Sequence, residues 1–150
     1  MNSISSYVMI DKLYEASRAG VKIQMIVRGI CCLIPGVKDM SENIEVISVV
    51  DKFLEHSRLY IFGEGNDCKV YISSADWMTR NIDTRVEVSC PIYSNKIKQE
   101  IIDTYQICWN DNVKARLLNT SKENEYRLND KPKVRSQIAI YNYYLNKLQN

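Results

Sequence analysis

Short runs of alternating apolar and polar residues are interspersed with longer segments of helical periodicity, and this order constrains the fold more than any other feature of the sequence. A period of two predicts strands, whereas apolar residues spaced three and four apart predict amphipathic helices. Strands are expected at 21–27, 44–50, 58–62, 69–73 and 86–92. Helices are expected at 6–19, 96–109 and 134–148. This interleaving indicates an α/β sandwich, a single domain with a mixed β-sheet flanked by helices.

Local signals place several boundaries of these elements. Ser5 or Ser6 can cap the first helix, and Gly20 follows its last turn as a stop. Residues 63–67 have the glycine, asparagine and aspartate content of a hairpin turn between two strands. Residues 51–55 are expected to form a short helical segment. In the tail, the polar stretch after two leucines predicts an irregular or hairpin segment.

Charge and composition exclude several classes of function. The chain has 150 residues, with 20 basic and 18 acidic side chains and a net charge of +2. This balance does not favour nucleic acid or membrane surfaces as partners, so an anion site has to be a local cluster. No apolar run approaches the length of a transmembrane segment, and the first residues lack the character of a signal peptide.

Cysteine and glycine patterns exclude some common sites. The five cysteines are odd in number and contain no Cys-x-x-Cys spacing, so neither a disulfide framework nor a zinc site is expected. Most of them lie among apolar residues and are interpreted as small core residues in a reducing compartment. The sequence has no glycine-rich phosphate loop and no acidic metal cluster, and no metal ligands are predicted.

Two positively charged positions are candidates for binding an anion. His56, the only histidine, stands two residues before Arg58 at the start of a predicted strand, which puts both side chains on one face. A histidine beside a fixed cation suits phosphate, although an ordinary surface or core histidine has the same pattern more often. Arg28 ends a strand of β-branched residues. It either points into a cleft at the carboxyl end of the strand or is an ordinary strand-end arginine.

Two further groups of polar residues follow. Ser73 and Ser74 can donate to a phosphate, and Asp76 can accept from a histidine or cap the next turn. Arg85 and Glu87 share a face at the entry to a strand. They form either a salt bridge or the polar wall of a nucleotide site, and their spacing does not decide between these.

Together these elements resemble one half of a phospholipase-D-type active site. That superfamily carries His-x-Lys, followed on a neighbouring strand by an element similar to Gly-Ser-x-Asn. This chain has His56-Ser-Arg58, with arginine in place of the lysine, and Ser-Ser-Ala-Asp at 73–76 in place of the second element. The resemblance implies a phospholipase D-like sandwich.

The match to the long family of polyphosphate kinases, which is built on that fold, is closer. Linked runs appear in the family's order and spacing at 13–17, 19–23, 26–31, 41–44, 53–58, 70–78 and 83–88. The similarity is strong over 2–118 and weaker in the tail from about 119. Residues 1–150 are therefore expected to form the C-terminal catalytic domain of this family, as a fragment of a larger multidomain enzyme.

The resemblance implies an activity for the whole enzyme. It is the reversible transfer of the terminal phosphate of ATP to inorganic polyphosphate, through a phosphohistidine on a domain that this chain lacks. ATP and ADP are the implied substrates, and magnesium is expected for the whole enzyme with ligands outside this fragment. The implied partners are polyphosphate, nucleotide, the missing domains and a possible second copy. The implied location is the cytoplasm, with membrane association only within the whole enzyme.

The resemblance also implies roles for single residues. Arg28 matches the family's phosphate-binding arginine, and His56 matches its second active-site histidine, which contacts nucleotide phosphates. Arg85 and Glu87 match a pair that lines the nucleotide pocket. Three more positions match family motifs and are expected to support the contacting residues or line a tunnel: Arg58, Asp76 and Arg80.

Two alternative functions remain open at this point. The chain can be a non-catalytic module that binds polyphosphate or nucleotide, or a phospholipase-D-like hydrolase in which two copies each contribute His56. In the family a strand leads directly into the region of Asn2, so an uncovered sheet edge is also expected here. Such an edge invites pairing with another copy.

Overall fold

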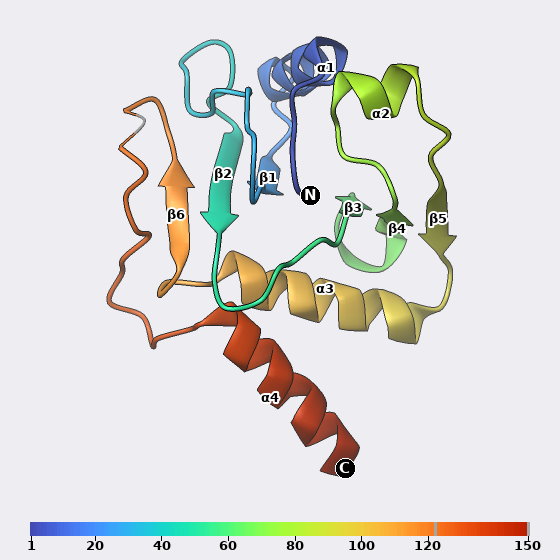
Figure 1. The fold of residues 1–150 in the computed structure, drawn as a ribbon, viewed down its shortest axis with the longest axis vertical. Helices are drawn as coiled ribbons and strands as arrows, with labels where there is room; N and C mark the ends of the chain where they lie inside the picture. The colour runs from blue at the N-terminus through green and yellow to red at the C-terminus, as the bar shows by residue number, and fades with distance from the viewer. Residues whose placement is uncertain (122, 150) are drawn as a thin grey trace.

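The expected α/β fold is confirmed by the computed structural model, which describes residues 1–121 and 123–149 (Figure 1). Its strands are divided between two three-stranded sheets. The first sheet is mixed and the second is antiparallel. The two sheets form one domain, and helices flank them (Figure 1).

The first sheet has the order β1-β2-β6 and contains most of the buried core. Its strands are β1 (Ile23–Ile26), β2 (Ile44–Val49) and β6 (Ala115–Leu118). β1 runs parallel to β2, and β6 runs antiparallel to it. All residues of β2 except Glu45 are buried, because this central strand is covered on both faces. β-Branched residues suit such a strand.

The second sheet has the order β3-β4-β5 and is more exposed. Its strands are β3 (Leu59–Phe62), β4 (Lys69–Ser73) and β5 (Ser89–Ile92). The predicted hairpin turn joins β3 to β4 and contains the short 3₁₀ helix Gly65–Asp67. Gly63 and Gly65 have φ values of +81° and +63°, which glycine adopts without steric cost. β5 is shorter than predicted, since the residues before it are exposed and unpaired with β4.

The N-terminal segment lies between the two sheets. The Ile4 amide donates to the Ile30 carbonyl at 2.8 Å, and the Ser5 amide donates to the Trp77 carbonyl at 2.9 Å. Ile4 is fully buried and belongs to the core of the first sheet. β1 is an edge strand of the first sheet, and β3 is an edge strand of the second. A pocket of about 590 Å³ is lined by residues of both of these strands.

Helices cover the sheets and confirm most of the helical pattern. They are α1 (Tyr7–Arg18), α2 (Thr79–Asp83), α3 (Asn95–Trp109) and α4 (Ser136–Gln149). Gly20, with φ of +86°, ends the first helix as predicted. Ser6 occupies the N-cap position, but its side chain makes no capping hydrogen bond. α3 runs across one end of both sheets, and α4 extends away from the body (Figure 1).

One local prediction was wrong, and one helix was not predicted. Residues 51–55 form no helix, because the Gln137 side chain hydrogen-bonds the backbone of Phe53. Gln137 Oε1 accepts from the Phe53 amide at 2.9 Å, and Gln137 Nε2 donates to the Phe53 carbonyl at 2.7 Å. The segment after β4 contains α2, a helix that the sequence pattern did not predict.

The hairpin predicted as one alternative for the tail is confirmed. Leu117 and Leu118 belong to β6, and the chain returns antiparallel to it, with the Leu117 amide donating to the Glu125 carbonyl at 2.9 Å and Arg116 bridging to Tyr126.

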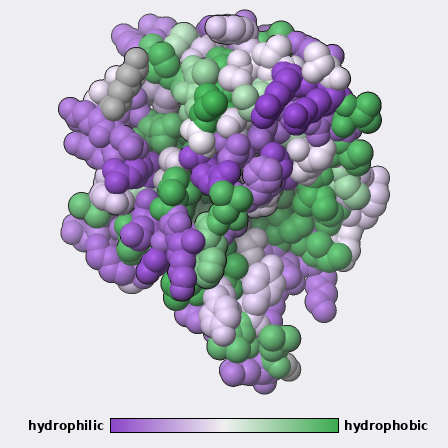
Figure 2. Space-filling model, viewed as in Figure 1, coloured by the Kyte–Doolittle hydropathy of each residue, from purple (hydrophilic) through white to green (hydrophobic). Residues whose placement is uncertain are grey.

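The surface is mixed in character. Figure 2 shows apolar atoms gathered over the β4–β5 side of one face, with hydrophilic residues over the opposite side. Exposed apolar residues of that region include Ile72, Val86 and Val88. None of the helices in the described part of the chain has the length and apolar character that a membrane crossing requires.

Candidate functional site

Arg28 lies two residues after the last residue of β1, at the carboxyl end of the strand, as predicted. Its backbone is held by the neighbouring strand, since the Ser48 hydroxyl donates to the Arg28 carbonyl at 3.2 Å. The guanidinium is half-buried, and both its Nε and its Nη2 donate to the Asn2 Oδ1, the first at 2.9 Å. Arg28 also lines the pocket between the sheets. The residue is therefore held at the boundary between the pocket and the N-terminal segment.

His56 and Arg58 lie together before β3. The Arg58 guanidinium contacts both ring nitrogens of His56, with Nη1 3.1 Å from Nδ1 and Nη2 3.0 Å from Nε2. Arginine has only donors, so the ring nitrogen that accepts from it carries no proton. His56 is exposed, whereas the Arg58 side chain is only 14% exposed. The predicted pair on one face is present, with a fixed cation beside an accessible imidazole.

Asp76 holds Arg58 and the N-terminal segment together. Its Oδ2 accepts from Arg58 Nη2 at 2.8 Å, and its Oδ1 accepts from the amides of Asn2 and Ser3 at 2.8 and 3.1 Å. Burial raises the pKa of Asp76, but the hydrogen bonds from Arg58 and from the two amides outweigh it, so the pKa lies below its usual value. Asp76 does not cap α2, where Met78 is the N-cap.

These contacts form one continuous chain of hydrogen bonds, here called the Arg28–His56 network. Its members are Arg28, Asn2, Asp76, Arg58 and His56. The network joins the end of the first sheet to the start of the second. It contains two guanidinium groups and one carboxylate, and this local excess of positive charge suits an anionic ligand.

Glu87 takes part in a separate cluster. Its Oε1 accepts from Asn81 Nδ2 at 2.6 Å, and its Oε2 accepts from the Ser74 hydroxyl. These two hydrogen bonds, that of Ser74 first, lower the pKa of Glu87. Ser73 is also engaged, accepting from the Ala75 amide at 3.1 Å. The two serine hydroxyls therefore already have partners within the protein.

Arg85 and Arg80 are exposed and lie outside both clusters. Arg85 makes no salt bridge with Glu87 among the described residues, so that interpretation of the pair was wrong. The Arg85 amide donates to the Arg80 carbonyl at 3.1 Å, at the end of α2. Both side chains are exposed, and the Arg85 guanidinium is close enough to Glu87 to lower its pKa.

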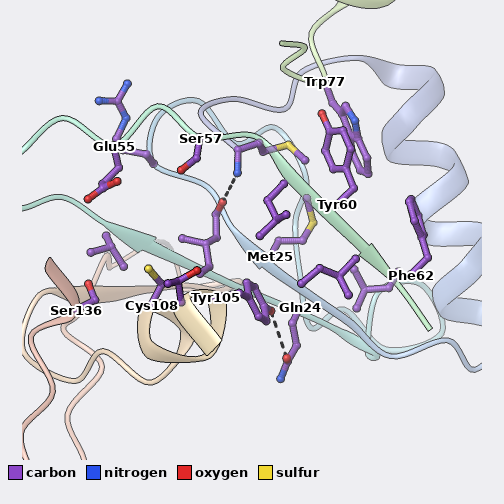
Figure 3. A pocket seen from close by; sticks show the side chains of 18 of the residues that line it. Gln24, Met25, Glu55, Ser57, Tyr60, Phe62, Trp77, Tyr105, Cys108 and Ser136 are labelled. Atoms are coloured by element: carbon purple, nitrogen blue, oxygen red, sulfur yellow. Dashed lines mark hydrogen bonds between the residues drawn. The ribbon is translucent and has the colours of Figure 1, made fainter. Parts of the chain in front are cut away.

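The pocket of about 590 Å³ is mainly apolar. Tyr60 stacks on Trp77 with ring centroids 5.1 Å apart, and the Tyr105 hydroxyl donates to Gln24 Oε1 at 3.3 Å on the other side (Figure 3). Burial raises the pKa of Tyr105 to about 12 and that of Cys108 to about 11, so both remain neutral at pH 7. Arg28 and Lys22 are the cationic side chains of the lining, whereas His56 and Arg58 are not part of it.

The described residues contain no group of three histidine, cysteine, aspartate or glutamate side chains arranged to hold a metal ion. Asp76, the carboxylate of the network, already accepts three hydrogen bonds. Magnesium prefers carboxylates together with substrate phosphates. The carboxylate present here is therefore engaged with protein donors and does not fit a magnesium ligand.

The sequence matches the family described as "Polyphosphate kinase C-terminal domain 2" over residues 1–137. The chain belongs to the polyphosphate kinase family. It is 51% identical to a polyphosphate kinase of Vibrio parahaemolyticus over 147 residues and 47% identical to that of Escherichia coli (strain K12) over 144 residues. These alignments cover 97% and 95% of this chain and 21% of each relative, so the chain spans about a fifth of their length.

The matching part of a solved polyphosphate kinase has nearly the same fold as this chain. The crystal structure of the enzyme from Porphyromonas gingivalis matches with a TM-score of 0.94 at 47% identity, covering 98% of this chain and 23% of that one. The identification made from the motifs, as a C-terminal domain of this family, is confirmed. The family thus explains why the strands and the polar motifs occur in this order.

Sequence reasoning missed Asn2, a member of the network in this polyphosphate kinase domain, and Ser3, whose amide also donates to Asp76. Asn2 and Ser3 have no motif of their own, and Ser3 contributes through its backbone amide, which every residue but proline possesses. Asn2 is separated from Arg28 by 26 positions and from Asp76 by 74. Contacts between residues so far apart in the sequence leave no local signal. The position of Asn2 and Ser3 immediately before the core residue Ile4 was the one indication of a structural role.

Proposed function

We propose that this polyphosphate kinase domain forms one side of an anion site that binds the terminal phosphates of ATP and polyphosphate. The observation that carries the proposal is the Arg28–His56 network, which links two guanidinium groups and one accessible imidazole through direct hydrogen bonds. Phosphoryl transfer depends mainly on positioning and on cations that offset the charge of the transition state. Arg28 and Arg58 meet both requirements.

Each residue has a distinct part in this proposal. Arg28 binds phosphate oxygens, Arg58 keeps His56 oriented, and His56 contacts the nucleotide phosphates and exchanges a proton with them. Asp76 holds Arg58 in place by the ion pair at 2.8 Å. Arg85 and Glu87 line the nucleotide side of the site, and the exposed Arg80 lies beside them along the path of the polymer.

Within the whole enzyme, the reaction transfers the ATP terminal phosphate reversibly to inorganic polyphosphate through a phosphohistidine on another domain. Magnesium, held by that part of the enzyme and by the substrate phosphates, supplies charge neutralisation. We also place the enzyme in the cytoplasm, with membrane association only within the whole enzyme. The other domains of the same chain, and a second copy along the open edges of β1 and β3, are its proposed protein partners.

The proposal is tested with the isolated chain and labelled ATP. The expected result is no acid-labile label and no polymer, because the nucleophilic histidine lies elsewhere. Robust acid-labile labelling of His56 would contradict this. In a second measurement, tripolyphosphate is titrated into the protein, and Arg28→Ala is expected to abolish most of the binding. Equal binding by both proteins would contradict the anion site.

A non-catalytic binding module is the second candidate function. It is favoured by the apolar pocket beside Arg28, which offers a nucleotide base a surface to pack against. Reconstitution decides between the two: the chain is mixed with a separately produced remainder of a polyphosphate kinase that lacks this domain. Restored polymer synthesis supports the catalytic role, and phosphate binding without restored synthesis supports the module.

The third possibility, a phospholipase-D-like hydrolase, is disfavoured. Arg58 stands in place of the superfamily lysine, and Asp76 stands in place of the asparagine of the second element. Phosphodiesterase activity that rises with dimer formation would revive this candidate.

A further inference from the structure

The side chain of Asn2 lies between the two halves of the proposed anion site. Its Oδ1 accepts from Nε and Nη2 of Arg28, while its backbone amide donates to Asp76 Oδ1 at 2.8 Å. Asp76 in turn holds Arg58. One residue of the N-terminal segment therefore contacts the cation of the first sheet and the carboxylate that orients the cation of the second.

The orientation of the Asn2 amide is determined by its neighbours. Its Nδ2 donates to the Ser3 hydroxyl at 3.1 Å, which leaves Oδ1 facing Arg28. A guanidinium has five N–H donors, and Oδ1 takes one from Nε and one from Nη2, so three remain for a ligand. Asn2 thus restrains Arg28 without neutralising its charge, which a carboxylate at the same position would do.

The chain next to Arg28 is shaped for this contact. Gly29 donates its amide to the Asn2 carbonyl at 2.7 Å. A Cβ at Gly29 would lie 3.1 Å from the Asn2 carbonyl oxygen and 3.2 Å from the Ser3 hydroxyl, both tighter than ordinary contacts. A larger residue at this position would therefore require the N-terminal segment to move away by a few tenths of an ångström.

We propose that Asn2 is a positioning residue: it holds the Arg28 guanidinium in the orientation that binds phosphate and couples it to the Asp76–Arg58 pair. The inference rests on the proposed anion site and adds to it the residue that organises it. A restrained guanidinium loses less conformational freedom when it binds an anion, so removal of Asn2 weakens binding without touching the ligand.

The first test is a double-mutant cycle on the 150-residue chain, with tripolyphosphate affinity measured by calorimetry. Asn2→Ala is expected to weaken binding by about tenfold, and to have no further effect in an Arg28→Ala background. Asn95→Ala, the same change on an exposed residue of α3, is the matched control and leaves the affinity unchanged. The proposal is overturned if Asn2→Ala and Asn95→Ala bind tripolyphosphate with equal affinity. It is also overturned if Asn2→Ala weakens binding as much in the Arg28→Ala background as in the unmodified chain.

The second test needs no ligand and separates this inference from the proposed function. The Arg28 Nε–H is followed by nuclear magnetic resonance, and its exchange with water is expected to be slow in the unmodified chain and fast in Asn2→Ala. Asn2→Asp keeps an acceptor oxygen and restores slow exchange, while its charge lowers tripolyphosphate affinity. If the unmodified chain binds no tripolyphosphate, the proposed anion site is wrong. If the Arg28 Nε–H also exchanges slowly in Asn2→Ala, the positioning role of Asn2 is wrong as well.

Gly29→Ala provides a variant that leaves the Asn2 side chain intact. The added methyl group pushes the N-terminal segment away from Arg28, so Nε–H exchange is expected to accelerate and tripolyphosphate affinity to fall. Slow exchange and full affinity in this variant contradict the dependence of Arg28 on the approach of Asn2.

Discussion

The two sheets of the molecule differ in what their residues contribute. In the first sheet, β2 is buried at five of its six positions and lies at the centre of both apolar clusters. In the second sheet, β3 has no buried residue, and the polar groups of His56, Arg58, Asp76 and Glu87 flank its strands. The comparison indicates that the first sheet supplies most of the stability, whereas the second sheet presents most of the proposed site.

The largest expected effect is in the core of the first sheet. Ile47→Ala removes a side chain that is 2% exposed in β2 and is expected to lower the free energy of unfolding by about 2–5 kcal/mol. Ile72→Ala in β4, where the side chain is 46% exposed, is the matched control and is expected to cost under about 1 kcal/mol. Urea unfolding measures both. Equal losses would show that the two sheets contribute alike.

A second large effect is expected where the tail joins the first sheet. Asp111 is fully buried; its Oδ1 accepts from three successive amides, including that of Ala115 at 3.0 Å, and its Oδ2 accepts from the Ser136 amide at 2.7 Å. Asp111→Ala leaves these donors without a partner and is expected to cost about 2–3 kcal/mol. Hydrogen exchange in the first turn of α4 should accelerate, while exposed Asp130→Ala should leave it unchanged.

A smaller effect on stability is expected at the boundary of the two sheets. Asp76→Asn keeps one acceptor oxygen for the amides of Asn2 and Ser3 but turns an NH₂ group toward Arg58, which only donates. The expected cost is about 1–2 kcal/mol, together with weaker tripolyphosphate binding. Asp83→Asn, on the exposed end of α2, serves as the control. Unchanged tripolyphosphate affinity in Asp76→Asn would show that the polar residues beside the second sheet do not contribute to the anion site.

The carboxylate of Asp76 makes the stability difference between the original protein and Asp76→Asn depend on pH. The pKa of Asp76 is lower in the folded than in the unfolded protein, so its ionisation stabilises the fold above the unfolded pKa of about 4. This contribution is lost as the pH falls through the folded pKa. The gap in unfolding free energy between the original protein and Asp76→Asn is therefore expected to be constant from pH 7 to about 5 and to shrink below about 4. If this gap in unfolding free energy stays the same down to pH 2.5, the ionisation of Asp76 is not its cause.

The smallest effect on stability is expected at Arg85. Its side chain is exposed and makes no salt bridge among the described residues, so Arg85→Ala should leave the urea midpoint unchanged. ATP binding by the same variant should weaken if Arg85 lines the nucleotide site. Arg18→Ala, at the end of α1, is the control. A shifted midpoint would show a structural role that the contacts do not reveal.

The sequence by itself determined the elements whose signals are local. Helices α1 and α3 follow from apolar spacing and, for α1, from a terminal glycine, and the β3–β4 hairpin follows from alternation around a glycine-rich turn. The contact of His56 with Arg58 was expected from a strand period of two, although both residues precede β3 in the structure. The family followed from linked motifs, which are a property of residue order alone.

Only the tertiary structure decided the features that join distant residues. The stretch 51–55 lost its expected helix because Gln137, 84 positions after Phe53, satisfies that backbone instead. Asp76 was open to a capping role until the fold brought Asn2 to it across 74 positions. A buried carboxylate binds whichever donors the packed chain brings within about 3 Å, and a one-dimensional pattern does not contain that proximity.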